Sequence, residues 1–157
     1  MSLLVLFACS TTNAATGAHL ETVDADTVDW KAKELPYWKE VLSEEQVRVC
    51  RQAGTERPWS SPMNDAHGEG SFVCSSCGQA LFDADAKFDS GTGWPSFHSP
   101  IDAKAVTELS DVSFGMIRTE VRCSRCDAHL GHVFDDGPKP TGKRYCINGV
   151  CLLKEPK

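Results

Sequence analysis

Two Cys-x-x-Cys pairs constrain this chain more than any other feature. The first pair comprises Cys74 and Cys77, and the second comprises Cys123 and Cys126. Two residues between the sulfurs let both thiolates of a pair turn toward one ion, and two pairs complete the tetrahedral four-sulfur site that Zn²⁺ favours. Four protein ligands leave no open position, so the pattern predicts one structural Zn²⁺ that fastens distant parts of the chain together.

A pair of disulfides is the competing interpretation of the same four cysteines, and an exported protein could form them. Two cysteines so close together rarely reach the geometry of an unstrained structural disulfide. A four-sulfur metal site also contributes folding free energy directly, so the metal is the favoured interpretation.

The rest of the chain predicts a mainly β domain behind small N-terminal helices. Residues 35–53 have a helical pattern, with a capping box at Ser43 and Gln46. Beyond Gly54, short apolar runs separated by Gly, Pro, Asp and Ser clusters predict antiparallel strands. The runs cover residues 72–74, 80–82, 106–109, 115–122 and 129–134.

The N-terminus has the character of a targeting signal. Residues 2–8 are apolar, too short to span a bilayer as a helix, and resemble the end of a secretory signal. The segment ending at Cys9 also resembles a lipobox, which would make a lipid anchor at Cys9 the only link to a membrane. We therefore expect residues 1–9 to be a signal, residues 10–34 a tether and residues 35–157 the folded domain. Export from a bacterial cytoplasm is the expectation, and a ragged terminus on a cytoplasmic protein is the alternative.

The charge balance excludes one class of partner. The chain has 16 Lys and Arg residues against 22 Asp and Glu residues, a net charge of −6. Binding to a nucleic-acid backbone requires clustered cations, and no basic stripe interleaved with aromatic residues is present. We therefore expect no nucleic-acid partner.

Cys146 has the neighbours of a reactive cysteine. A strand through this segment would place Arg144, Cys146 and Asn148 on one face, which gives a cation, a nucleophile and an amide in one row. The competing interpretation is an inert cysteine buried in a terminal strand.

Two other stretches supply groups that suit a reaction at this thiol. Trp94 lies on a loop rich in Gly and fixed by Pro, as expected for the wall of an apolar pocket. His129 and His132 could donate protons, but their spacing places them on opposite faces of a flat strand unless Gly131 bends it. Asp136 belongs to a turn sequence, and it could also orient one of the histidines.

Several of these stretches together resemble a known family. "GTER", "KFDSGTGWPSF" and "RTEVRCSRCDAHLGHVFDDGPKPTGKRYCIN", with both Cys-x-x-Cys pairs, are similar to methionine sulfoxide reductase B, the peptide-methionine (R)-S-oxide reductases. The resemblance covers about residues 38–153. It implies the β-tent fold, in which two antiparallel sheets accompany small helices, and repair of oxidised proteins.

The resemblance also implies a role for each matching residue. Cys146 matches the nucleophile that attacks the sulfoxide sulfur and becomes a sulfenic acid. His129, His132 and Asn148 match the groups that hold and protonate the oxygen, Arg144 the cation beside the thiolate, and Trp94 the pocket wall. The four paired cysteines match the structural zinc ligands, and a thioredoxin-like dithiol is the implied reductant.

This chain departs from many family members at Thr92, where they have a resolving cysteine. Cys50 is the favoured substitute, and Cys151, Cys9 or direct reduction by an external thiol are the alternatives. A runner-up function of another class is a binding module on the same zinc fold, which would need no nucleophile.

Overall fold

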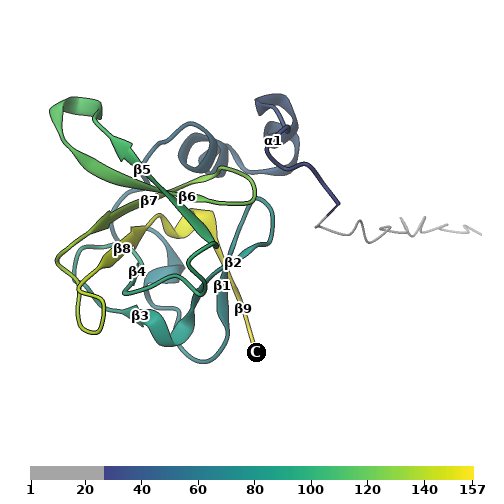
Figure 1. The fold of residues 1–157 in the computed structure, drawn as a ribbon. Coiled ribbons are helices and arrows are strands. Elements are labelled where there is room, and N and C mark those ends of the chain that lie inside the picture. Colours follow the sequence, from purple (N-terminus) through teal and green to yellow (C-terminus); the bar gives the residue numbers. More distant parts are fainter. Residues whose placement is uncertain (1–26) are drawn as a thin grey trace, which may run out of the picture.

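Two antiparallel sheets form the framework of the described chain, which comprises residues 27–157 of this computed structural model (Figure 1). One sheet has three strands in the order β2-β1-β9, and the other has six in the order β3-β4-β8-β7-β6-β5. The strands are β1 Ser71–Cys74, β2 Ala80–Asp83, β3 Lys87–Phe88, β4 Ser96–Phe97, β5 Val106–Asp111, β6 Arg118–Cys123, β7 His129–Phe134, β8 Arg144–Ile147 and β9 Leu152–Glu155. The prediction of a mainly β fold with two antiparallel sheets is confirmed.

Short helical segments accompany the sheets. Two α-helices and a π-helical turn lie near the N-terminal end of the described chain, and single 3₁₀ turns connect later strands. They are α1 Leu35–Val41, α2 Glu44–Gln46, η1 Val47–Arg51, η2 Pro62–Asn64, η3 Ala84–Ala86, η4 Ser113–Gly115 and η5 Gly149–Cys151.

The capping box at Ser43 divides the helix that the sequence predicts over residues 35–53. The Ser43 side chain accepts from the Gln46 amide, and the Gln46 side chain accepts from the Ser43 amide. An N-cap residue has an extended backbone, here with ψ 159°, so a helix cannot run through it. The capping box is therefore confirmed, and the single continuous helix was wrong.

Aromatic side chains fill the space between the two sheets. The ring of Phe97 on β4 stacks on that of Phe82 on β2, with centroids 4.3 Å apart, and meets Phe72 on β1 edge-on at 5.0 Å. Tyr145 on β8 contacts Phe82 from the same side. Because side chains alternate along a strand, the neighbours Ser96 and Cys146 point to the opposite face of the larger sheet.

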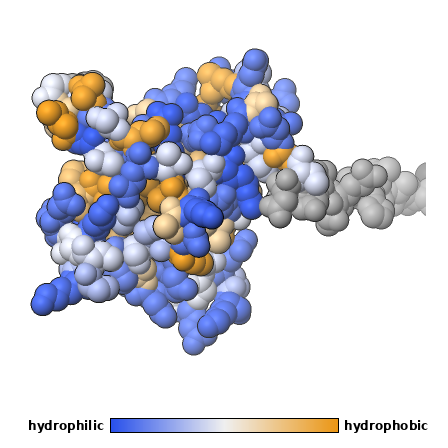
Figure 2. All heavy atoms as spheres, in the orientation of Figure 1, coloured by the Kyte–Doolittle hydropathy of each residue, from blue (hydrophilic) through white to orange (hydrophobic). Residues whose placement is uncertain are grey.

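The β5–β6 hairpin extends from the upper left of the molecule (Figure 1). The sequence predicts that its second strand starts at residue 115, but η4 occupies the tip and β6 begins at Arg118. Exposed apolar side chains gather at this tip, as Figure 2 shows, and they include Val112 and Ile117, which are 71% and 89% exposed. The base of the same hairpin reaches the site described below.

The expected signal segment and most of the expected tether, residues 1–26, lie outside the described residues. The last part of that tether, residues 27–34, packs on the folded domain, since the ring of Trp30 stacks on Trp38 with centroids 6.2 Å apart. Among the described residues, every helix is too short or too polar to cross a bilayer.

Candidate active site and metal centre

A row of polar side chains crosses the outer face of the larger sheet. The strand register places Cys146 on β8 directly between Ser96 on β4 and His132 on β7, and His132 is paired in turn with Glu120 on β6. Directly opposite residues on one face of a sheet have their Cβ atoms about 5 Å apart. The fold therefore sets an imidazole and a carboxylate in line with the Cys146 thiol.

A bulge in the β6–β7 pairing brings His129 to the same face as His132. Val121 pairs with Gly131 but the next residue, Arg122, pairs with His129, so Leu130 is the extra residue. The two imidazole rings lie 5.6 Å apart in an edge-to-face arrangement. The sequence analysis places the two histidines on opposite faces only of a flat strand and allows for a bend at Gly131, and the strand is irregular at this point.

Gly131 is required at this bulge. Its φ of +155° is unfavourable for residues with a side chain, and an added Cβ would lie 2.0 Å from the Cys146 carbonyl oxygen. The glycine thus allows β7 and β8 to approach closely beside Cys146.

Each histidine has its own carboxylate partner, and Asp136 is neither of them. His129 Nδ1 lies 2.6 Å from Glu120 Oε1, and His132 Nε2 lies 2.7 Å from Asp111 Oδ2. Asp136 instead accepts two hydrogen bonds of 2.8 Å from the Arg144 guanidinium. The expectation that Asp136 orients a histidine was therefore wrong.

Burial governs the ionisation of the first of these pairs. Burial lowers the pKa of His129, and the Glu120 carboxylate only partly offsets that effect. Burial would raise the pKa of Glu120, but hydrogen bonds from Arg122 and His129 outweigh it and leave the pKa below its usual value. Glu120 is therefore a carboxylate at neutral pH, beside an imidazole that loses its charge easily.

A cavity of about 160 Å³ opens over Cys146. Its walls include Trp94, as the sequence predicts, together with His132 and Asn148. The remaining lining residues are Thr55, Arg118, Gly131 and Phe134. His129 lines an adjoining cavity, which shares Thr55, Arg118 and His132 with the first.

Asn148 is held mainly by the backbone. Its side chain is buried, accepts from the Glu56 amide at 3.0 Å and donates to the Leu130 carbonyl at 3.0 Å. One N–H of the amide group remains for a substrate, because a primary amide has two. Arg144 is close to Cys146 but lies over the Phe134 ring, 4.5 Å from its centroid, and does not line the cavity.

Glu56 is a functional residue that the sequence analysis does not single out. Its buried carboxylate accepts from the amides of Gly149 and Val150 at 2.6 and 2.8 Å, and its carbonyl accepts from Trp94 Nε1 at 3.3 Å. It therefore links the pocket wall to the turn that follows Cys146. Its place in the "GTER" motif was the available signal.

The resting Cys146 is a partly shielded thiol. Burial raises its pKa, while the Thr92 hydroxyl, 4.0 Å from the sulfur, and the Arg144 guanidinium act in the opposite direction. A thiol with this balance is protonated at neutral pH and becomes a thiolate when a proton acceptor is at hand.

The four paired cysteines form one buried cluster on the other side of the core, and their sulfurs all lie within 4.8 Å of one another. The contacts between pairs, Cys74 to Cys126 and Cys77 to Cys123, are 3.8 and 3.6 Å. Four sulfurs at about 2.3 Å from a tetrahedral ion are separated by about 3.8 Å. The donor set and its spacing therefore fit a metal ion.

Both halves of the cluster have the same backbone turn. The amide of Gly78 donates to the Cys74 carbonyl at 2.8 Å, and that of Asp127 donates to the Cys123 carbonyl at 2.9 Å. Both residues have positive φ, at 72° and 56°. The two knuckles therefore present their sulfurs in matching geometry.

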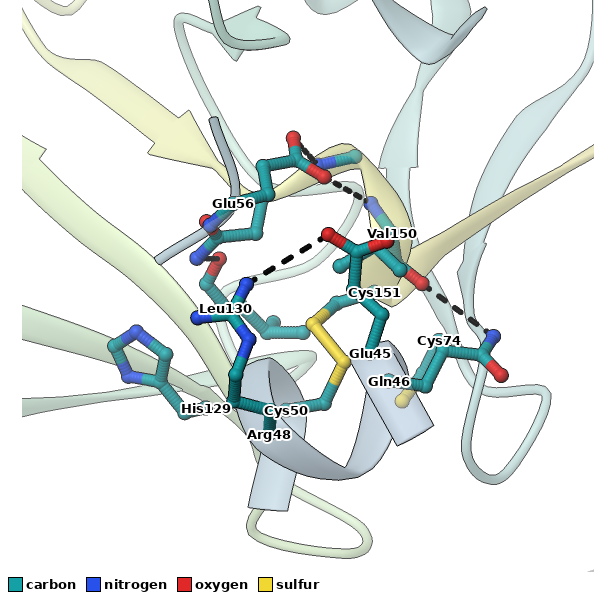
Figure 3. The surroundings of a disulfide bond; sticks show 12 residues. Glu45, Gln46, Arg48, Cys50, Glu56, Cys74, His129, Leu130, Val150 and Cys151 are labelled. Carbon is teal, nitrogen blue, oxygen red and sulfur yellow. Dashed lines mark hydrogen bonds and ion pairs between the residues drawn. A yellow bond between two sulfur atoms is a disulfide. The ribbon is translucent and has the colours of Figure 1, made fainter. Parts of the chain in front are cut away.

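A disulfide joins Cys50 on η1 to Cys151 on η5 (Figure 3). Both residues are almost fully buried, at 1% and 0% exposure. The expectation of a resolving thiol at Cys50 does not match this arrangement, because its sulfur is bonded to Cys151. Among the described cysteines, only Cys146 lies outside both the cluster and the disulfide.

A half-buried thiol opposite an imidazole, close to a guanidinium and in a cavity with an aromatic wall, has the features of an enzyme site that depends on a reactive thiol. The SelR domain family matches residues 42–156. A relative from Pseudomonas savastanoi pv. phaseolicola is 57% identical over 130 residues, which cover 83% of this chain and 99% of that protein. Relatives from Pseudomonas putida and Pseudomonas aeruginosa are each 58% identical over 125 residues, which cover 80% of this chain and 95% of theirs.

All three relatives have the name peptide methionine sulfoxide reductase MsrB. The chain belongs to this MsrB family, whose domain is SelR.

Proposed function

We propose that this protein reduces methionine-R-sulfoxide in oxidised proteins to methionine, with Cys146 as the nucleophile. The observation that carries the proposal is the placement of Cys146 directly opposite His132, beneath Trp94, in a chain of this family. Oxidised proteins are its substrates, and protein repair after oxidative stress is its role.

The reaction transfers one oxygen atom from the substrate sulfur to the enzyme sulfur. The Cys146 sulfur attacks the sulfoxide sulfur as the thiol gives up its proton, and the sulfoxide oxygen gains a proton, which the His132 imidazole is placed to carry. The oxygen then leaves as part of a Cys146 sulfenic acid, and methionine is released. Trp94 contacts the apolar end of the substrate, Arg144 stabilises the thiolate, and Asn148 and His129 support the oxygen side of the site.

A thioredoxin-like dithiol completes the cycle. Its first thiol condenses with the sulfenic acid to give a mixed disulfide and water, and its second thiol attacks the reductant sulfur of that bond, which frees the Cys146 thiol. Direct reduction is the route that the Cys50–Cys151 disulfide favours, because neither of these sulfurs is a free thiol. A resolving role for Cys50 would require that bond to be opened first.

The four-cysteine cluster holds one structural Zn²⁺ in this proposal. Cys74, Cys77, Cys123 and Cys126 would be its ligands, and the ion would tie the β1–β2 turn to the β6–β7 turn. All four positions are protein sulfurs, so the ion stabilises the fold and has no open position for substrate.

We also propose that the protein is exported. The buried Cys50–Cys151 bond supports this, because disulfides form and persist in oxidising compartments. Mass spectrometry of the mature N-terminus tests it, and an intact N-terminus in the cytosolic fraction would contradict it.

The activity is tested with dithiothreitol as reductant and the two epimers of methionine sulfoxide as substrates. We expect turnover of the R epimer only, and its loss in Cys146→Ser, because serine cannot form the sulfenic acid. Cys9→Ser changes one thiol outside the described residues and is the matched control, with full activity expected. Turnover in Cys146→Ser would overturn the mechanism, and none in the parent would favour the binding module instead.

A further inference from the structure

Asp111, the last residue of β5, makes the shortest polar contact to His132. Its Oδ2 lies 2.7 Å from His132 Nε2 and accepts a second bond of 2.7 Å from Arg118 Nη2. Its Oδ1 accepts from the Ser113 amide at 2.9 Å. A backbone amide and a guanidinium therefore fix the carboxylate where it meets the imidazole.

The hairpin architecture produces this clamp. Asp111 and Arg118 are directly paired residues of the β5–β6 ladder, and the tip between them turns through η4. Hydrogen bonds from Ser113 and His132 hold the pKa of Asp111 well below its usual range, so it is a carboxylate throughout the neutral region.

The His132 side chain lies between Asp111 and Cys146 in this arrangement of contacts. His132 is the cross-strand partner of Cys146 and lines the cavity over it, whereas Asp111 lines only the adjoining cavity. Asp111 therefore does not touch a substrate in the Cys146 cavity, and any effect on the reaction must pass through the imidazole.

We propose that Asp111 is a positioning residue for the sulfoxide reduction described above, which fixes the orientation and the tautomer of the His132 ring. A carboxylate that accepts from Nε2–H leaves Nδ1 as the nitrogen available to the reaction. The inference rests on the proposed function, and Arg118 and the Ser113 amide support it by holding the carboxylate.

Other charged and titratable groups also face His132, so a change of pH dependence has to be assigned to Asp111 by substitution. They come from β6, β7 and β8, and they are Arg118, Glu120, His129 and Cys146.

Asp111→Asn preserves the shape and the bond to the Ser113 amide but removes the negative charge. Asp83→Asn is the matched control, because Asp83 Oδ1 accepts from the Asp85 amide at the same 2.9 Å and Asp83 lines neither cavity. The assay is a single turnover of methionine-R-sulfoxide without reductant, measured as methionine formed, from pH 5 to pH 9.

We expect Asp111→Asn to slow the single turnover by about 10-fold or more, since general acids contribute about 10²–10⁴-fold and the ring is only partly misplaced. The concentration of substrate at half-maximal rate should change by less than about 3-fold, because Asp111 contacts the His132 ring and not the substrate, and the pH profile should differ from that of Asp83→Asn. In a His132→Asn background, Asp111→Asn should have no further effect.

A rate and pH profile equal to those of Asp83→Asn, or an effect that adds to that of His132→Asn, would overturn the proposal. Asp111→Ser, whose hydroxyl can still accept the Ser113 amide, provides the same comparison if Asp111→Asn does not fold. The tautomer of His132, read from the nitrogen NMR shifts of its ring, separates this inference from the proposed function. Loss of the Nε2–H tautomer in Asp111→Asn supports the contact even for a parent without turnover, and an unchanged tautomer contradicts it.

Discussion

The Cys50–Cys151 disulfide should be the largest single covalent contribution to the stability of this domain. The bond joins residues separated by 101 positions and lies wholly in the interior. A cross-link of this span lowers the conformational entropy of the unfolded chain and stabilises the native state by about 4.7 kcal/mol at 25 °C.

The metal cluster changes the stabilisation expected from the disulfide only slightly. If the ion stays bound in the unfolded chain, it holds Cys74 near Cys126, and the loop that the disulfide closes shortens to roughly 50 residues. Halving a loop lowers its closure entropy by only about 0.6 kcal/mol, so about 4 kcal/mol remains. With a urea dependence of about 2 kcal/mol/M, opening the bond should lower the unfolding midpoint by about 2 M.

Equilibrium unfolding in urea, followed by tryptophan fluorescence, measures this shift. Trp38 is 1% exposed, and the guanidinium of Arg51, next to Cys50 in the chain, lies 4.2 Å from its ring centroid, so one of the four tryptophans of the chain reports from beside the bond. Three samples are compared: the oxidised parent, the parent reduced with a phosphine, and Cys50→Ala/Cys151→Ala. The reduced parent isolates the cross-link, because it keeps both sulfur atoms in place.

The reasoning is refuted if alkylation shows that both thiols were freed and the midpoint of the reduced parent moves by less than about 0.5 M. Such a result would mean that the unfolded chain is already restrained by other means, so that the cross-link removes little entropy.

Two further predictions concern the metal cluster and Glu56. Elemental analysis should find one zinc ion per chain. Cys74→Ser should lose the ion and unfold at a markedly lower temperature, because a structural zinc site contributes its binding free energy to folding. Wild-type thermal stability in a protein without metal would contradict this prediction. Glu56→Gln should lower the free energy of unfolding by about 1–3 kcal/mol in urea melts, because its –NH₂ group would face one of the two backbone N–H groups that the carboxylate accepts. Glu45→Gln is the exposed control. An equal loss of stability in both variants would show that the hydrogen bonds of the Glu56 carboxylate do not stabilise the fold.

The sequence predicts strands β1, β2, β5, β6 and β7, because their apolar runs are short and clearly bounded, but it does not predict β3, β4 and β9. Residues 129–134 form β7 as expected, and residues 72–74 lie within β1. The N-terminal helix was predicted too long although Ser43 was recognised as a cap, because the apolar spacing on both sides of the cap is helical. The spacing of apolar residues predicts both helices but does not detect the turn between them.

The sequence predicts the candidate site where the position of a side chain depends on one strand alone. It does not predict the contacts that depend on how several strands pair. The alternation of Arg144 and Cys146 on β8 follows from the period of two, and β8 shows it. The Leu130 bulge reverses the expected face of His129, and only the pairing with β6 creates it. The contact between Asp111 and His132 likewise depends on the register of three strands, which the sequence does not specify locally.

Three kinds of cysteine coexist in the described chain, and their surroundings keep their chemistry apart. The cluster and disulfide sulfurs are all buried, whereas Cys146 is half-buried at the floor of a cavity, with Arg144 and Thr92 close to it. A thiolate must be reached before it can react, so exposure selects Cys146 before any difference in ionisation does. The same burial shields the Cys50–Cys151 bond, so under the proposed mechanism an external dithiol would reach Cys146 before it could open the cross-link that holds η5 in place.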